Sequence, residues 1–197
     1  VVWIARAIDL PPVWRGAIVG AGVVLVIGLQ AQRCADYDAQ IANDSRDNLR
    51  RWADAALPQY TRIVADGYTA LRGAGSYPPE YATRLRVVSP FFAPDVGTID
   101  DLRARGYFYV AIASSNYDRF LTPHTRPGGQ TDPVTGEFRP DPGAAHDFNR
   151  RLQFYQRLMR EFPVVWQQKA THPMWTFANP DITVYRIGEP PRDNRVR

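Results

Sequence analysis

The sequence predicts an α/β fold in which a transmembrane helix precedes a small, mostly parallel α/β sandwich domain. Three observations lead to this prediction. Residues 16–29 form an unbroken run of apolar or small side chains. Further along, segments with helical periodicity alternate with short β-branched segments, which is the order expected when helices cover the faces of a sheet. Hydrophobic residues make up 45% of the chain, enough to bury a core.

The apolar run has the length of a membrane span. The stretch "RGAIVGAGVVLVIGLQAQR", residues 15–33, carries no charge between its two arginines. With its flanks it extends to about 20 residues, which suffices to cross roughly 30 Å of hydrocarbon. We therefore expect a transmembrane helix, with Arg15 near one interface and with Trp3 and Trp14 as interfacial aromatic residues.

Two alternatives for this run remain open. One is a buried helix or strand of a soluble domain, which the unbroken apolar composition disfavours. The other is a signal peptide, but "LQAQRC" lacks the small residue that a lipoprotein signal places directly before a cysteine such as Cys34. Because the chain begins with Val1 and not with Met, we expect a processed protein or part of a longer one.

The run divides the chain into two parts. Residues 1–33 are the predicted transmembrane helix with the loop before it, and residues 34–197 are a predicted soluble domain. Arg6 and Arg15 precede the apolar segment, whereas aspartates follow it closely. The positive-inside rule then places the soluble domain on the extracytoplasmic side of an inner or plasma membrane. The lipid bilayer is accordingly the first partner we expect.

The soluble domain begins with a helix at residues 44–57. Asn43 or Asp44 can cap its start, and Pro58 ends it. Helical spacing brings four residues to one face, namely Leu49, Trp52, Ala53 and Ala56.

Short strands and helices follow in alternation. We predict strands at 61–66 and 84–91, and then a short helix at 97–106. The stretch "YFYVAIAS", residues 107–114, is the most strongly predicted strand, because its nearly continuous apolar residues suit a sheet covered on both faces. A further helix begins with "SNYDRFL".

The last third of the chain combines a loop, a helix and two strands. Residues 122–145 are rich in Pro and Gly and predict a long flexible loop or flap. A helix is predicted at 146–162, followed by two closing strands in "PVVWQQKA" and "DITVYRI", which we expect to pair antiparallel. One face of this helix should carry Phe148, Leu152, Tyr155 and Leu158 or Met159.

Composition excludes several classes of function. The net charge of +4 is spread over Arg-Asp mixtures, without the basic block that follows a nucleic-acid backbone, so no nucleic-acid partner is expected. Cys34 is the single cysteine, which rules out an internal disulfide and a Cys-based zinc site. The spacing of His124, His146 and His172 matches no helical metal pair. Because nucleophile-elbow and phosphate-loop motifs are also missing, we predict no catalytic residue, metal ligand or cofactor.

A candidate binding site follows the most strongly predicted strand. The stretch "SSNYDRF", residues 114–120, lies where this strand ends, and ligands of α/β sheets often bind at that edge. Tyr117, Asp118 and Arg119 are the candidate substrate-binding residues. Asp118 and Arg119 have the chemistry to hold a sugar or a phosphate.

A purely structural interpretation of this stretch stays open. In it, one of the two serines caps the next helix, Asp118 pairs with an arginine, and Tyr117 and Phe120 pack in the core. The same choice, between a cap with an ion pair and a site, applies to Asp44 and Arg46.

Four features in order resemble a known family. After the apolar helix come "DSRDNLRRW", then "YVAIASSNYDR", then "NPDITVYR". Residues 15–188 resemble the C-terminal region of polytopic membrane glycosyltransferases that use a polyprenyl-phosphate sugar donor, the relatives of protein O-mannosyltransferases and of the lipid A aminoarabinose transferase. The matching positions are Asp44, Ser45, Arg46 and Trp52; Tyr109 to Arg119; and Pro180, Ile182, Val184, Tyr185 and Arg186.

The resemblance implies a part of an enzyme. The chain would hold the last span and the extracytoplasmic domain of an integral membrane glycosyltransferase, with the donor held by a transmembrane bundle outside this sequence. The family's catalytic carboxylate is expected in the first extracytoplasmic loop, so no catalytic residue is carried over. The domain would cap the bundle or aid acceptor binding through residues 117–119 and the flap at 122–145.

Two other functions remain as alternatives. The first is a membrane-anchored extracytoplasmic binding or assembly module without catalytic activity. The second is an independent soluble hydrolase-like or nucleotide-binding enzyme, which the missing motifs disfavour.

Overall fold

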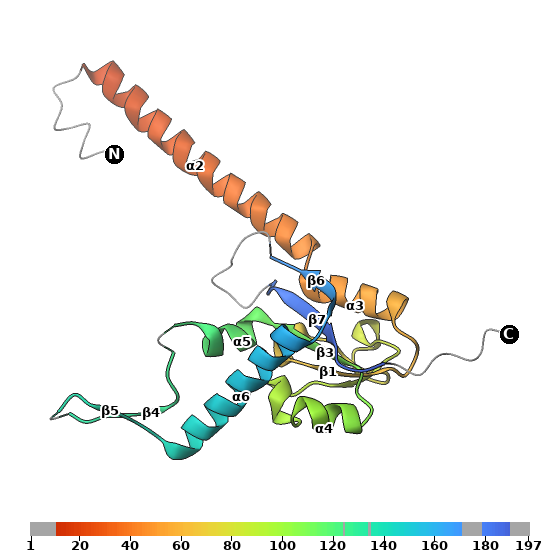
Figure 1. Ribbon diagram of the computed structural model, residues 1–197. Coiled ribbons are helices and arrows are strands. Elements are labelled where there is room, and N and C mark those ends of the chain that lie inside the picture. Colours follow the sequence, from red (N-terminus) through yellow and green to blue (C-terminus); the bar gives the residue numbers. More distant parts are fainter. Residues whose placement is uncertain (1–10, 124, 134, 171–178, 190–197) are drawn as a thin grey trace. The chain divides into compact units, whose positions relative to one another are not determined.

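The computed structural model describes residues 11–123, 125–133, 135–170 and 179–189. The chain forms two compact units, residues 1–43 and 44–197. The first contains an apolar helix and the second an α/β domain, so the predicted fold class is confirmed at this level (Figure 1).

The described part of the first unit contains one long helix, α2 (Pro12–Ala42). Its segment Gly16–Ala39 is long and apolar enough to span a membrane, and none of its most hydrophobic stretch is buried. Val24, for example, leaves 70% of its surface exposed. This exposure fits a membrane span or a signal segment.

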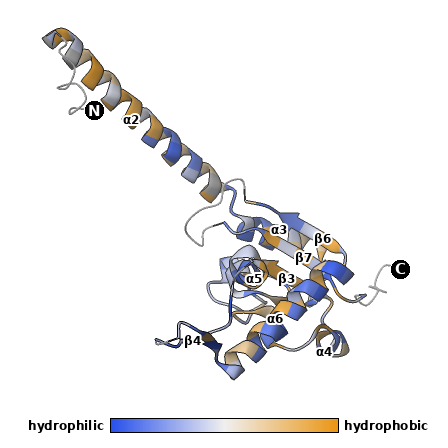
Figure 2. Ribbon diagram, turned by 60° about the vertical axis from the view of Figure 1, so that its left-hand side comes forward, coloured by the Kyte–Doolittle hydropathy of each residue, from blue (hydrophilic) through white to orange (hydrophobic). Residues whose placement is uncertain are grey.

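The helix continues past the expected boundary at residue 33. Figure 2 shows its residues becoming more hydrophilic toward its C-terminal end. Ala, Gln and Arg in this part favour helix in water as well as in lipid, so the helix does not stop where its apolar stretch stops. The predicted roles of Trp3 and Arg6 lie outside the described residues, whereas Trp14 lies on α2 and is exposed.

Five strands of the second unit form one sheet in the order β2-β1-β3-β7-β6. β1 pairs in parallel with β2 and β3, whereas β7 pairs antiparallel with β3 and β6. The sheet is therefore mixed, and the mostly parallel sandwich that we expected is not confirmed. The strands are β1 (Arg62–Ala65), β2 (Arg86–Val88), β3 (Tyr109–Ala113), β6 (Val164–Gln168) and β7 (Ile182–Arg186).

Chain order accounts for the mixed sheet. Residues 66–85 join β1 to β2, and α4 (Ile99–Ala104) lies between β2 and β3, so both connections are long enough to return the chain for parallel pairing. After helix α6 (Pro142–Glu161), β6 and β7 follow one another and pair antiparallel, as expected for the closing strands. β7 lies between β6 and β3 and runs antiparallel to both strands.

Helices cover both faces of this sheet (Figure 1). Val110 and Ile112 of β3 point to the face that packs against α4, α5 (Ser114–Leu121) and α6. The alternate residues of β3 point to the other face, which packs against α3 (Ser45–Ala56). The arrangement is a three-layer α/β/α domain, in which the core lies on both sides of β1 and β3.

Local capping signals fix where several helices start. Asp44 caps α3 by accepting from the backbone N–H of Arg46, as predicted. Thr98 and Asp101 cap each other's backbone at the start of α4. At α5 the prediction of a serine cap is wrong, because Ser114 is the first helical residue and Ala113 occupies the cap position without a side-chain hydrogen bond.

The expected flap at 122–145 contains regular structure. Its two short strands, β4 (Gly129–Thr131) and β5 (Phe138–Pro140), pair antiparallel as a hairpin. Elsewhere in the domain, short 3-10 turns lie at Gly67–Thr69, Pro79–Tyr81 and Ala93–Asp95. Gly129 permits this pairing, because a Cβ there would approach the Phe138 ring to 2.7 Å. Helix α6 begins earlier than predicted, since Asp141 caps it.

Candidate functional site

Three of the stretches that resemble the glycosyltransferase family meet at one edge of the sheet. The parallel strands β1 and β3 both end there, and the antiparallel strand β7 begins there. The start of α3 is held against the same place. We call this region the carboxyl edge; it comprises Asp44 to Arg46, Asp66, Ser114 to Asp118, and Asn179 to Asp181.

Hydrogen bonds from two serines join the three stretches. The backbone N–H of the buried Ser45 donates to Oδ1 of Asn179 at 2.8 Å, and its hydroxyl donates to the carbonyl of Pro180 at 2.6 Å. The backbone N–H of Ser114 donates to the carbonyl of Asp181 at 2.9 Å. In return, the Asp181 N–H donates to the Ser114 hydroxyl at 3.1 Å. The serines of these motifs therefore hold the edge together.

The centre of the carboxyl edge is filled by Asp66. This residue directly follows β1 and is fully buried. Its carboxylate accepts from the N–H of Ala93 at 2.6 Å, from the N–H of Ala113 at 3.3 Å and from the Tyr155 hydroxyl at 3.0 Å. Burial raises the pKa of Asp66 to about 7, against the opposing effect of these three hydrogen bonds.

A second buried polar side chain closes the same place. Asn116 of α5 is fully buried, and its amide donates to the carbonyl of Phe91 at 2.7 Å. Its Oδ1 accepts from the N–H of Tyr68 at 3.4 Å. Ligands of parallel sheets usually enter between the carboxyl ends of neighbouring strands, and here Asp66 and Asn116 occupy that position.

The structure separates the three predicted site residues. Tyr117, Asp118 and Arg119 follow one another on α5, so each side chain is turned about 100° from the last. Tyr117 is half-buried, and its ring centroid lies 6.0 Å from that of Tyr155. Burial, with nearby carboxylates, raises the pKa of the Tyr117 hydroxyl, so it stays neutral.

Asp118 belongs to the outer surface of the carboxyl edge. The residue is exposed, yet partial loss of hydration and the neighbouring carboxylate of Asp181 raise its pKa. The carboxyl groups of Asp118 and Asp181 are therefore close enough to affect each other electrostatically. Asp118 forms no ion pair with the described residues, so the expected pairing with an arginine is not found among them.

Arg119 lies away from that surface. Its guanidinium carbon is 5.4 Å from the centroid of the Phe92 ring and 5.9 Å from that of Phe91. One guanidinium nitrogen donates to the carbonyl of Ser115 at 3.3 Å. The side chain lines a cavity between α5 and α6 whose lining does not include Asp118.

Asp44 and Arg46 form a local ion pair at the start of α3. The Arg46 Nε donates to both oxygens of Asp44, at 2.9 and 3.1 Å, and a second guanidinium nitrogen also contacts the carboxylate. Burial opposes the effect, but the hydrogen bonds with Arg46 hold the pKa of Asp44 below its usual range. The cap with an ion pair is thus confirmed for these two residues.

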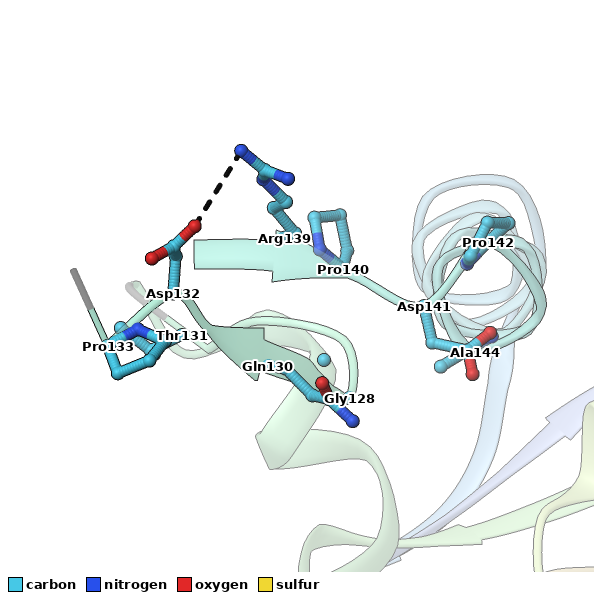
Figure 3. A pocket seen from close by; sticks show the side chains of 11 residues that line it. Gly128, Gln130, Thr131, Asp132, Pro133, Arg139, Pro140, Asp141, Pro142 and Ala144 are labelled. Carbon is cyan, nitrogen blue, oxygen red and sulfur yellow. Dashed lines mark hydrogen bonds and ion pairs between the residues drawn. The ribbon is translucent and has the colours of Figure 1, made fainter. Parts of the chain in front are cut away.

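A cavity lies at the hairpin. It measures about 620 Å³ and is lined by β4, β5 and the first turn of α6. Figure 3 shows its side chains, among them Asp132 and Arg139, whose charged groups lie 3.9 Å apart. A second cavity, of about 380 Å³, lies between α4 and α6 and includes Thr98, Arg150 and Arg157.

The described residues of the carboxyl edge provide hydrogen-bond donors and acceptors. In the part of the chain that the structure describes, no three His, Cys, Asp or Glu side chains gather as metal ligands. His146 is exposed on α6, whereas His124 and His172 lie outside the described residues. Burial raises the pKa of Asp66 to about 7, but its side chain is fully buried and cannot contact a substrate.

Sequence reasoning missed the buried pair of Asp66 and Tyr155. The signal for Asp66 was present, because a polar residue directly follows the apolar residues of β1. Tyr155 was assigned to the apolar face of α6, which is correct, but its hydroxyl partner is 89 residues away and has no local signal.

No family model, curated protein or solved structure matches this chain.

Proposed function

We propose that this chain is the last span and the extracytoplasmic domain of an integral membrane glycosyltransferase that transfers a sugar from a polyprenyl-phosphate donor. In this proposal the donor and the catalytic carboxylate belong to a transmembrane bundle outside the sequence. The domain caps that bundle and uses its carboxyl edge to bind the acceptor.

One observation carries the proposal. The three stretches that resemble the family are far apart in the sequence, and direct hydrogen bonds from Ser45 and Ser114 join them at one edge. Only Asn43 separates Asp44 of this edge from the end of α2. If α2 is a membrane span, the carboxyl edge contains the first residues of the domain that follow this span in the chain.

The exposed groups of the edge suit a hydroxylated acceptor. The exposed carboxylate of Asp118 can accept hydrogen bonds from sugar or protein hydroxyls, and hydrogen bonds to a charged acceptor are stronger than those between neutral groups. Asp181 is half-buried, and one of its carboxylate oxygens already accepts from the N–H of Ala170 at 2.6 Å. Arg46 is held by Asp44 and leaves one-third of its side chain exposed, so it can donate to the same ligand. None of these groups forms a nucleophile with its own base, which supports a binding role.

The test is sugar transfer by the intact membrane protein. Membranes that contain it are supplied with a radiolabelled polyprenyl-phosphate sugar, and transfer is followed as a function of acceptor concentration. We expect Asp118→Ala to raise the KM for acceptor about tenfold with kcat little changed, as for a lost hydrogen bond to a charged group. Glu137→Ala, an exposed carboxylate on the hairpin, is the control.

An anchored binding or assembly module is the second candidate. It is favoured by the lack of a nucleophile with its base among the described residues. Absence of any transfer from lipid-linked sugars would overturn the first proposal and favour this module. Transfer that Asp118→Ala leaves unchanged would overturn the assigned role of the carboxyl edge.

A further inference from the structure

A cavity between α5 and α6 is lined by three arginines. It measures about 330 Å³ and also takes in the segment 125–128. Its walls carry the side chains of Arg119, Arg126 and Arg151 on a floor that includes Phe120 and Phe148. We call it the arginine cavity. It is separate from the carboxyl edge, and nothing in the proposed function requires it.

Two of these arginines have no carboxylate partner among the described residues. Arg119 contacts the Phe91 and Phe92 rings and a backbone carbonyl. Arg126 stacks over the Phe138 ring at 5.7 Å. A guanidinium that rests on an aromatic ring keeps its N–H donors available at its rim. Both side chains are therefore free to donate into the cavity.

The nearby carboxylates do not neutralise Arg119 and Arg126. Arg151 makes a two-point pair with Asp95, at 2.9 and 3.1 Å. Asp147, the carboxylate on the cavity wall, lies 3.4 Å from Arg150. Each local carboxylate thus already faces an arginine other than Arg119 and Arg126, and the cavity keeps an excess of positive charge.

Aromatic rings hold the cationic groups in place. The guanidinium of Arg151 lies 4.4 Å from the Phe92 centroid, over the same ring that Arg119 contacts at 5.4 Å. Phe92 packs in turn against Phe120 at 5.3 Å. Two guanidinium groups are therefore fixed against one buried ring before any ligand arrives, which lowers the entropic cost of binding.

We propose that the arginine cavity binds a phosphate group. Arginine donors in a planar fork match the oxygens of a phosphate. Two guanidinium groups without a carboxylate partner in the described part of the chain line this cavity, together with a third that Asp95 orients. The cavity lies at the small end of ligand-binding pockets, and its volume is enough for a phosphomonoester or a diphosphate. The phosphate can come from a soluble compound or from a lipid headgroup.

The test uses the full chain in phosphatidylcholine nanodiscs, titrated with inorganic pyrophosphate by calorimetry. Arg119→Gln and Arg126→Gln should each weaken binding about tenfold, as expected when a charge-assisted hydrogen bond is lost. Arg105→Gln is the matched control, because Arg105 also stacks on a ring, at 5.4 Å from Tyr107, and donates to a carbonyl outside the cavity.

The outcomes are distinct. Wild-type binding that both cavity variants weaken and Arg105→Gln leaves unchanged supports the proposal. Arg119→Lys should bind at an intermediate level, since it keeps the charge and loses the fork. No binding by the wild type, or equal weakening by Arg105→Gln, would overturn the proposal. Melting curves without pyrophosphate check that each variant is folded.

A second arm identifies the source of the phosphate. Nanodiscs with phosphatidic acid, a phosphomonoester lipid, are compared with nanodiscs of matched surface charge made with phosphatidylglycerol. Weaker pyrophosphate binding in the phosphatidic acid discs alone means that a lipid headgroup competes for the arginine cavity. Equal binding in both assigns the cavity to a soluble phosphate. Sugar transfer is not measured in either arm, so the result is independent of the proposed function.

Discussion

The hydroxyl of Tyr155 on α6 donates to both carboxylate oxygens of Asp66, at 3.0 and 3.2 Å. Both residues are fully buried. This contact ties the longest helix of the domain to the end of β1, at the position where parallel sheets usually admit ligands. The pair therefore stabilises the centre of the carboxyl edge and keeps it closed.

We predict that the stability of the domain falls as pH rises through the range set by Asp66. Its pKa is about 7 in the folded state and near 4 in the unfolded chain. Between these values the unfolded state ionises first, so the free energy of unfolding should fall with pH, by at most about 4 kcal/mol. Above about pH 7 both states are ionised and this dependence ends.

Urea denaturation of residues 44–197 at a series of pH values measures this dependence, since both cores lie in that unit. Asp66→Asn removes the titrating group and should flatten the profile, at a lower overall stability because its amide nitrogen cannot accept a hydrogen bond. A wild-type profile that rises across the same range would contradict the assignment.

Tyr155→Phe should destabilise the domain by about 1–3 kcal/mol, because it removes a buried donor to a carboxylate. It should also raise the pKa of Asp66 further, so that the loss of stability extends to higher pH. Tyr185→Phe makes the same chemical change at a hydroxyl with no hydrogen bond to the described residues. If both variants lose equal stability, the hydroxyl of Tyr155 has no special role.

Ser45→Ala tests whether the stretches at the carboxyl edge depend on each other. The substitution leaves the carbonyl of Pro180 without its buried donor and should cost about 1–2 kcal/mol in unfolding free energy. Hydrogen exchange should speed up at the start of β7 as well as at the start of α3. Ser76→Ala, at a hydroxyl without a hydrogen bond to the described residues, provides the comparison. If both substitutions lower the free energy of unfolding equally, the hydrogen bond from Ser45 to Pro180 does not hold the stretches together.

Gly129→Ala should open the hairpin of β4 and β5. An added Cβ would collide with the partner strand, including Phe138, at an expected cost of about 1–3 kcal/mol. Limited proteolysis should then cut faster within 129–140. Gly128→Ala is a matched neighbour, because its Cβ would meet Ala144 at an ordinary 3.5 Å. Equal cleavage of the two variants would mean that the hairpin does not need this glycine.

The sequence predicted most elements whose signals are local. Helix α3 was found from the cap at Asp44 and the stop at Pro58, and β3 from its continuous apolar residues. Both signals act within a few residues of the boundary they set. The hairpin was missed because residues 122–145 are rich in Pro and Gly, a composition typical of loops. Its strands form by pairing, for example of Gly129 with Pro140, which this composition does not indicate.

The arrangement of the sheet and the site depended on contacts between distant residues. β7 pairs with β3 and β6, and the residues of β7 do not by themselves indicate which strands will lie beside it. The burial of Asp66 likewise depends on α6. Tyr117, Asp118 and Arg119 were grouped because they are adjacent in sequence, and the helix that contains them directs their side chains to different places.

Labelling of the hairpin from outside the cell tests the central claim, that α2 anchors an extracytoplasmic domain. In a Cys34→Ser background, Glu137→Cys places the single thiol on the exposed hairpin. The account predicts that a membrane-impermeant maleimide labels this thiol in intact cells and that the protein sediments with membranes. Labelling only after lysis, or protein in the soluble fraction, would contradict it.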